Sequence, residues 1–136
     1  MPVLRRVLET ALYCDDLQST TAFYERLLAA TPMLRTDRVV AFDAGDSTVL
    51  LLFRRGHTRP LQTDGGLVPG HDGSGPTHLA FAIDRDESPH WELHLAALSV
   101  VVESRVTWPL GGLSLYFRDP DGRSVELATP GTWPSY

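Results

Sequence analysis

The feature that most constrains the fold of this chain is an internal repetition of residue classes. Residues 9–15 read Glu-Thr-Ala-Leu-Tyr-Cys-Asp, and residues 78–84 read His-Leu-Ala-Phe-Ala-Ile-Asp. Each stretch precedes a helical pattern and then strand patterns, so the order strand, helix, three strands occurs twice. Neither half can bury its own sheet. We therefore predict an α+β fold of two βαβββ modules forming one curved mixed sheet around a central cavity.

Alternation and capping signals predict the elements of both halves. In the first half they give strands over 5–14, 33–36, 39–43 and 48–54, and a helix from 17 to about 30 with Asp16 as its N-cap and Pro32 beyond its end. In the second half they give strands over 77–84, 100–106, 114–118 and 124–128, and a helix to about 98 opened by Ser88 as N-cap and Pro89. The run 49–53 is apolar on both faces, so we expect it to be a central, fully covered strand.

The domain organisation predicted from these patterns is a single domain over residues 1–136. Its first module covers 4–56 and its second covers 77–130. The segment 57–76 between them is rich in glycine and proline and has little periodicity, so it is expected to be a mobile connector or lid without regular structure.

Composition excludes several classes of function. The chain has 136 residues and a net charge of −5, with its basic residues scattered, which argues against nucleic acid and anionic membranes as partners. Cys14 is its only cysteine, so an intrachain disulfide is impossible and a reducing compartment is expected. Neither a secretory signal nor a membrane-spanning run is visible. We expect a cytoplasmic protein.

The first residue that demands a chemical explanation is Glu126. Asp119-Pro-Asp-Gly122 has the chemistry of a tight turn, and the strand after it alternates Val125 and Leu127 with small residues and one carboxylate. A carboxylate seldom lies inside a core strand unless a cation or hydrogen-bond donor compensates its charge.

Two other strands repeat this pattern. Glu9 shares a face with Ala11, and His78 shares a face with Ala80 and Ala82, while bulky residues occupy the opposite faces. A sheet face lined with small residues, two carboxylates and one imidazole suits a divalent metal. Each residue alone also has an ordinary interpretation, an ion-paired edge glutamate or a satisfied core histidine.

The chain resembles the vicinal oxygen chelate superfamily, the glyoxalase, bleomycin resistance and extradiol dioxygenase group. The resemblance covers nearly the whole chain and is carried by three motifs: Leu8-Glu-Thr-Ala-Leu-Tyr-Cys-Asp-Asp-Leu17 with Ala22-Phe-Tyr24, Gly75-Pro-Thr-His-Leu-Ala-Phe-Ala82, and Tyr116-Phe-Arg-Asp-Pro-Asp-Gly122 with Val125-Glu-Leu127. The resemblance implies a glyoxalase-like fold, in which the two modules share the cavity.

The resemblance also implies a ligand set and substrate contacts. It assigns the metal to Glu9, His78 and Glu126; Glu9 stands where histidine is commoner in the family. The last strand of the first half offers only Leu50 or Leu51 at the remaining ligand position, so the chain resembles the three-ligand members, such as fosfomycin-resistance enzymes and dioxygenases. Tyr116 and Ser114 correspond to substrate-facing positions in that group. The metal, Zn, Mn, Ni, Co or Fe, is not identified by the sequence.

The function expected from this resemblance is that of a metal-dependent lyase, isomerase or dioxygenase acting on a small oxygenated substrate. The metal would stabilise an enolate or oxyanion, a glutamate such as Glu126 would act as base, and Tyr116 would hydrogen-bond the substrate. The alternative from a different class is a binding protein that sequesters an antibiotic without turnover. A homodimer is expected in either case, because small members of the family commonly pair.

Other residues have weaker functional interpretations. Trp108 and Trp133 would wall an aromatic pocket or pack at an interface. His57 and His71 fall in the connector, where a role as acid or base in a lid is an alternative to simple solvation. His90 and His94 have a chelating i, i+4 spacing that is usually incidental on an exposed helix. Cys14 is expected to be a buried apolar thiol.

Overall fold

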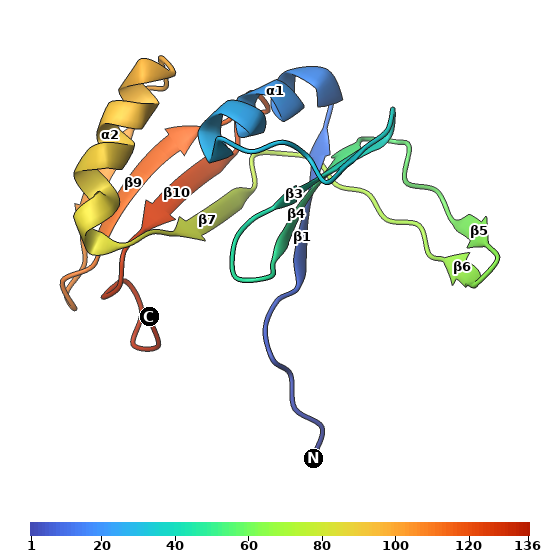
Figure 1. Cartoon of the computed structure of the whole chain (residues 1–136), viewed down its shortest axis with the longest axis horizontal. Coiled ribbons are helices and arrows are strands. Elements are labelled where there is room, and N and C mark those ends of the chain that lie inside the picture. The colour runs from blue at the N-terminus through green and yellow to red at the C-terminus, as the bar shows by residue number, and fades with distance from the viewer. The chain divides into compact units, whose positions relative to one another are not determined.

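The computed structural model describes residues 1–136, which divide into two compact units, Met1–Ser74 and Gly75–Tyr136. Each unit contains a four-stranded mixed sheet and one α-helix (Figure 1). The prediction of an α+β fold with a repeated βαβββ order is confirmed. The two sheets are separate, and no strand pairing closes them into one.

The first unit has strands in the order β1-β4-β3-β2. Its elements are β1 (Glu9–Cys14), α1 (Leu17–Leu28), β2 (Leu34–Arg35), β3 (Val39–Asp43), β4 (Val49–Arg54) and the two-stranded hairpin β5 (Leu61–Thr63) and β6 (Gly66–Val68). β4 lies parallel to β1 and antiparallel to β3. The prediction that the run 49–53 is a central strand is therefore confirmed. Its expected full coverage was wrong, because Val49, Leu51 and Phe53 on one face are only partly buried.

The two faces of this sheet differ in burial. Leu50 and Leu52 are buried on the face that packs against α1, which contributes Tyr24 and Leu27 to the core. The predicted N-cap is confirmed, since the carboxylate of Asp16 accepts a hydrogen bond of 3.1 Å from the backbone N–H of Ser19. The other face carries Glu9, Ala11 and Tyr13 on β1 and is incompletely covered. This is the face on which small residues were expected to leave room.

The second unit repeats the arrangement with strands in the order β7-β10-β9-β8. Its elements are β7 (His78–Ala82), the short 3-10 helix η1 (Arg85–Glu87), α2 (Ser88–Ala97), β8 (Ser104–Thr107), β9 (Leu113–Arg118) and β10 (Ser124–Ala128). α2 lies along one side of this sheet (Figure 1). Leu95 of α2 and the alternate residues Phe117, Val125 and Leu127 form the buried core.

Three predicted boundaries were wrong. The first strand begins at Glu9 instead of residue 5. Ser88 is the first residue of α2 and not its cap, because η1 leads directly into the helix. The strand expected over 100–106 is Ser104–Thr107, since the backbone N–H of Val100 is used by the helix end, where it donates to the carbonyl of Leu95 at 2.9 Å.

The segment 57–76 also differs from its prediction. It contains β5 and β6, so the expectation of no regular structure was wrong for these residues. Leu61 pairs with Val68, and the hydroxyl of Thr63 donates to the carbonyl of Gly66 at 2.7 Å. Neither α-helix of the chain is long and apolar enough to cross a membrane.

Candidate metal and substrate site

One face of the second sheet gathers polar side chains from β7, β9 and β10. The register pairs Glu126 with Tyr116, Ala128 with Ser114, and Ser124 with His78. Because side chains alternate along a strand, His78, Glu126, Ser114 and Tyr116 all lie on this face, opposite the core residues. The predicted alternation of the strands that carry His78 and Glu126 is confirmed.

His78 and Glu126 are in direct contact. Nε2 of His78 lies 3.1 Å from Oε2 of Glu126. The Glu126 side chain is 8% exposed and the His78 side chain is 52% exposed. The pair therefore opens to solvent on the imidazole side and is enclosed on the carboxylate side.

The second ring nitrogen of His78 defines the tautomer. Nδ1 lies 2.8 Å from the backbone carbonyl oxygen of Ser124, which can only accept a hydrogen bond, so Nδ1 carries a proton. In the neutral imidazole, Nε2 then presents a lone pair to a carboxylate oxygen. Nε2 of His78 and Oε2 of Glu126 would then both be acceptors, so a cation is needed between them. It is either a second proton on the ring or a metal ion. A carbonyl on the far nitrogen also orients many metal-binding histidines. The pair therefore fits a divalent metal.

The other carboxylate oxygen of Glu126 is held by a relay of side chains. The Ser114 hydroxyl donates to Oε1 at 2.5 Å, and the indole Nε1–H of Trp108 donates to the Ser114 oxygen at 2.7 Å. Ser114 is buried and Trp108 is half-buried. The relay fixes the orientation of the carboxylate, and it was not predicted because β8 ends before Trp108 and strand alternation does not extend to it.

Tyr116 stands beside the pair. Its ring stacks on the His78 ring with centroids 6.2 Å apart and planes inclined by 27°. Burial raises the pKa of the Tyr116 phenol, and the negative charge of Glu126 and a hydrogen bond with it raise that pKa further. At neutral pH the hydroxyl therefore keeps its proton and serves as a hydrogen-bond donor.

Glu9 belongs to the other unit. It is the exposed first residue of β1, on the same face of the sheet as Ala11 and Tyr13, as predicted. The contact between His78 and Glu126 lies within the second unit, so the convergence of Glu9 with them stays a prediction. The structure has no cluster of three or more histidine, cysteine, aspartate or glutamate side chains arranged to hold a metal.

The remaining candidates have ordinary surroundings, with two exceptions. His90 lies 3.5 Å from Glu87, and His94 packs against Trp91. Cys14 is fully buried, as expected, and Trp133 is exposed. The exceptions are His57 and His71, which both line a pocket that the sequence did not indicate. Nδ1 of His71 lies 2.6 Å from the Tyr13 hydroxyl.

Comparison with known proteins identifies related sequences. The family described as the Glyoxalase/Bleomycin resistance protein/Dioxygenase superfamily matches residues 6–127. Metallothiol transferase FosB of Bacillus licheniformis is 31% identical over 116 residues, which span 85% of this chain and 69% of that protein. The FosB of Lysinibacillus sphaericus is 28% identical over 117 residues, spanning 85% and 75%.

A solved structure has the same fold over almost the whole chain. The crystal structure of lactoylglutathione lyase from Agrobacterium tumefaciens matches with a TM-score of 0.84 and 34% identity, covering 95% of this chain and 96% of that one.

Proposed function

Because this chain belongs to the Glyoxalase/Bleomycin resistance protein/Dioxygenase superfamily, we propose that it is a metal-dependent enzyme acting on a small oxygenated substrate. Glu9, His78 and Glu126 would hold the metal. Two carboxylates and one neutral imidazole balance the charge of a divalent ion and are ligands that such ions accept. When bound, the ion would act as a Lewis acid toward oxygen atoms of the substrate.

The observation that carries this proposal is the state of the pair His78 and Glu126. The imidazole commits its Nδ1 proton to the carbonyl of Ser124 at 2.8 Å and directs Nε2 at the carboxylate 3.1 Å away. A histidine kept only for packing has no need of a buried carboxylate opposite its remaining nitrogen. The pair lies at the solvent-facing side of its sheet, where a ligand has access to it.

Each neighbouring side chain receives a role from its contacts. Tyr116, with its raised pKa, would donate a hydrogen bond to a substrate oxygen. Glu126 is the candidate base, a role that requires its carboxylate to leave the metal. Ser114 is buried, and its hydroxyl is already engaged by Glu126 and Trp108, which favours a positioning role over the substrate contact that the family resemblance implies. The half-buried ring of Trp108 would border the substrate.

The reaction class follows from the relatives only at a coarse level. The names of the relatives, metallothiol transferase and lactoylglutathione lyase, describe chemistry on a thiol and on an acylated thiol. They favour lyase, isomerase or thiol-transfer chemistry over oxygen insertion for this chain. The homodimer and the cytoplasmic location stay predictions, which light scattering and cell fractionation would test.

The test begins with metal content. The protein purified without chelator is expected to contain about one divalent ion per chain by elemental analysis, because the three proposed ligands would together hold one ion. Glu9→Gln, His78→Gln and Glu126→Gln should each lose most of it. The first assays use lactoylglutathione in one reaction and a thiol together with an acceptor for that thiol in another. Activity should decrease in the same variants that lose the metal.

Glu92→Gln is the matched control, because Glu92 lies on an exposed surface where it pairs with Arg105 at 2.8 Å. It should keep the metal. Full metal content in Glu126→Gln would refute the ligand set. Tight binding of an intact antibiotic to the EDTA-treated protein, without turnover by the metal-loaded one, would instead support the sequestration alternative.

A further inference from the structure

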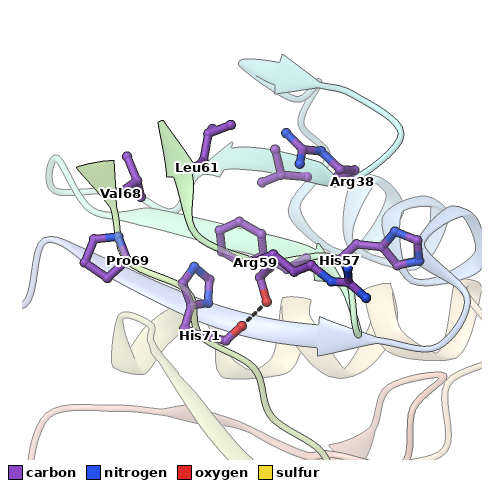
Figure 2. A pocket seen from close by; sticks show the side chains of 10 residues that line it. Arg38, His57, Arg59, Leu61, Val68, Pro69 and His71 are labelled. Carbon is purple, nitrogen blue, oxygen red and sulfur yellow. Dashed lines mark hydrogen bonds between the residues drawn. The ribbon is translucent and has the colours of Figure 1, made fainter. Parts of the chain in front are cut away.

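The first unit contains a pocket that the proposed metal chemistry does not use. It encloses about 130 Å³ between the ends of β3 and β4 and the chain that leads into and out of the β5–β6 hairpin (Figure 2). It is lined by Arg38, Val39, Phe53, His57, Thr58, Arg59, Leu61, Val68, Pro69 and His71. All of these residues belong to one compact unit.

One side of the pocket is cationic. Arg38, His57 and Arg59 gather there, as Figure 2 shows. Neither the Arg38 nor the Arg59 guanidinium has a hydrogen bond or ion pair in the structure. Other arginines of the same unit differ: Arg35 pairs with Glu25, and Arg55 pairs with Asp15 at 2.5 Å. Two unpaired guanidinium groups at a concave site present free donors to an anion.

The opposite side of the pocket is apolar. Leu61, Val68 and Pro69 lie together there (Figure 2), and Val39 and Phe53 add further apolar lining to the pocket. Leu61 is 44% exposed and Val68 is 48% exposed. Their apolar surface faces a site that a compact hydrocarbon group would cover favourably.

The walls are fixed to the sheet by several contacts. The Tyr13 hydroxyl lies 2.6 Å from Nδ1 of His71, and the Phe53 and His71 rings meet edge to face with centroids 4.7 Å apart. The hydroxyl of Thr58 donates to the backbone carbonyl of His71. The backbone N–H of His71 donates in turn to the backbone carbonyl of Thr58 at 3.0 Å. A Cβ added to Gly70 would meet Pro60 at 2.9 Å, so the two chain segments at the base of the hairpin are in close contact.

A neighbouring carboxylate does not neutralise the site. Asp72 accepts from the backbone N–H of Gly56 at 3.1 Å and from the N–H of Gly73 at 2.9 Å. Each of its oxygens thus accepts from one backbone N–H, and Asp72 forms no ion pair with Arg38 or Arg59.

We propose that this pocket binds a small organic anion, a carboxylate or a phosphate monoester attached to a single ring or a branched aliphatic group. The acid group contacts Arg38 and Arg59, and the apolar body lies on Phe53 between Leu61 and Val68. The volume suits one ring, since a dry protein cavity of about 150 Å³ accommodates benzene. The site stands on the first unit alone and does not depend on the metal.

The pocket has a defined relation to Glu9 within its own sheet. Val39 pairs with Phe53 and Phe53 with Tyr13, whereas Glu9 pairs with Val49 at the other end of β1. Tyr13 and Glu9 are four residues apart on one strand, so the pocket and Glu9 occupy the same face. An anion bound here would lie on the face that carries the proposed ligand.

The experiment uses the full chain, treated with EDTA to exclude binding at a metal. Backbone amide NMR titrations with benzoate, phenyl phosphate and neutral benzyl alcohol follow shifts at residues 38–39, 57–59 and 68–71. The two anions should bind there and benzyl alcohol at least tenfold more weakly, with the ratio of benzoate to phenyl phosphate affinity identifying the preferred acid group. Added salt should weaken the anions only.

Variants separate this site from the proposed metal centre. Arg38→Gln combined with Arg59→Gln should reduce anion affinity tenfold or more, and Arg38→Lys with Arg59→Lys should restore part of it. Arg35→Gln, the matched control, should bind as the wild type does. Equal binding of benzyl alcohol, an unchanged affinity in the double glutamine variant, or loss of binding in Glu126→Gln would overturn the proposal. None of these results bears on metal content.

Discussion

Arg123 and Asp119 form an ion pair that is almost entirely removed from solvent. Nη1 of Arg123 lies 2.9 Å from Oδ2 of Asp119, and the two side chains are 3% and 0% exposed. The other oxygen of Asp119 accepts from the backbone N–H groups of Asp121 and Arg123, each at 3.0 Å. The turn between β9 and β10 is therefore built around one carboxylate, and β10 carries Glu126.

Asp119→Ala should destabilise the protein strongly. It leaves the buried guanidinium without its main partner and frees two backbone donors, and breaking a buried pair typically costs about 3–5 kcal/mol. The measurement is the free energy of unfolding in urea. Glu103→Ala removes an exposed pair with Arg118 and should cost less than about 1 kcal/mol. Similar losses in both variants would contradict the buried role of Asp119.

Ser114→Ala should affect both stability and the metal. The substitution leaves Oε1 of Glu126 and Nε1–H of Trp108 without their shared partner, which costs about 1–3 kcal/mol in a buried site. If Glu126 is a ligand, the loss of its supporting hydrogen bond should also weaken metal binding by roughly 10–100-fold. Competition with a fluorescent chelator measures this affinity.

Ser104→Ala is the control for that prediction, because Ser104 is exposed on β8. A Ser114→Ala protein that is less stable but keeps its metal affinity would mean that the relay supports packing alone. If neither the stability nor the metal affinity of Ser114→Ala changes, the hydrogen bonds of Ser114 with Glu126 and Trp108 do not hold the carboxylate in position.

Much of this fold could be predicted because strand alternation is a local signal. Val125 and Leu127 alternate with Glu126, and the register confirmed the face that each occupies. Helix α1 was found from its Asp16 cap. The β5–β6 hairpin was missed because its three-residue strands are too short to show a period, although the Asp64-Gly65 pair between them is a turn signal.

The candidate site was predictable only in its residue types. Alternation put His78 and Glu126 on open faces, but their contact depends on the register between β7 and β10, which a single strand does not encode. The cationic pocket was not visible at all. Arg38 precedes β3 and Arg59 follows β4, and only the packed chain brings the two together.

Asp72→Asn should lower the pKa of Tyr13. Burial is the larger cause of the raised pKa of this phenol and the negative charge of Asp72 is the smaller one, so the neutral amide removes part of the shift and leaves the pKa above its ordinary value. The folded state holds the Tyr13 proton to a higher pH than the unfolded state, whose phenol titrates near about 10. The resulting stability is complete below that pH and is lost as the pH rises through the folded pKa.

Ultraviolet absorbance of tyrosinate against pH measures this pKa, with Tyr13→Phe assigning the transition among the four tyrosines of the chain. Raising the pH should also reduce the free energy of unfolding less in Asp72→Asn than in the wild type. The reason is that the pH range between the unfolded-state and folded-state pKa of Tyr13 is narrower in the variant. Asp64→Asn, at the exposed tip of the β5–β6 hairpin, should leave the titration unchanged. If the pKa of Tyr13 decreases equally in both variants, the effect comes from net charge and not from the position of Asp72. If it does not decrease in Asp72→Asn, then Asp72 does not help to keep Tyr13 protonated beside His71.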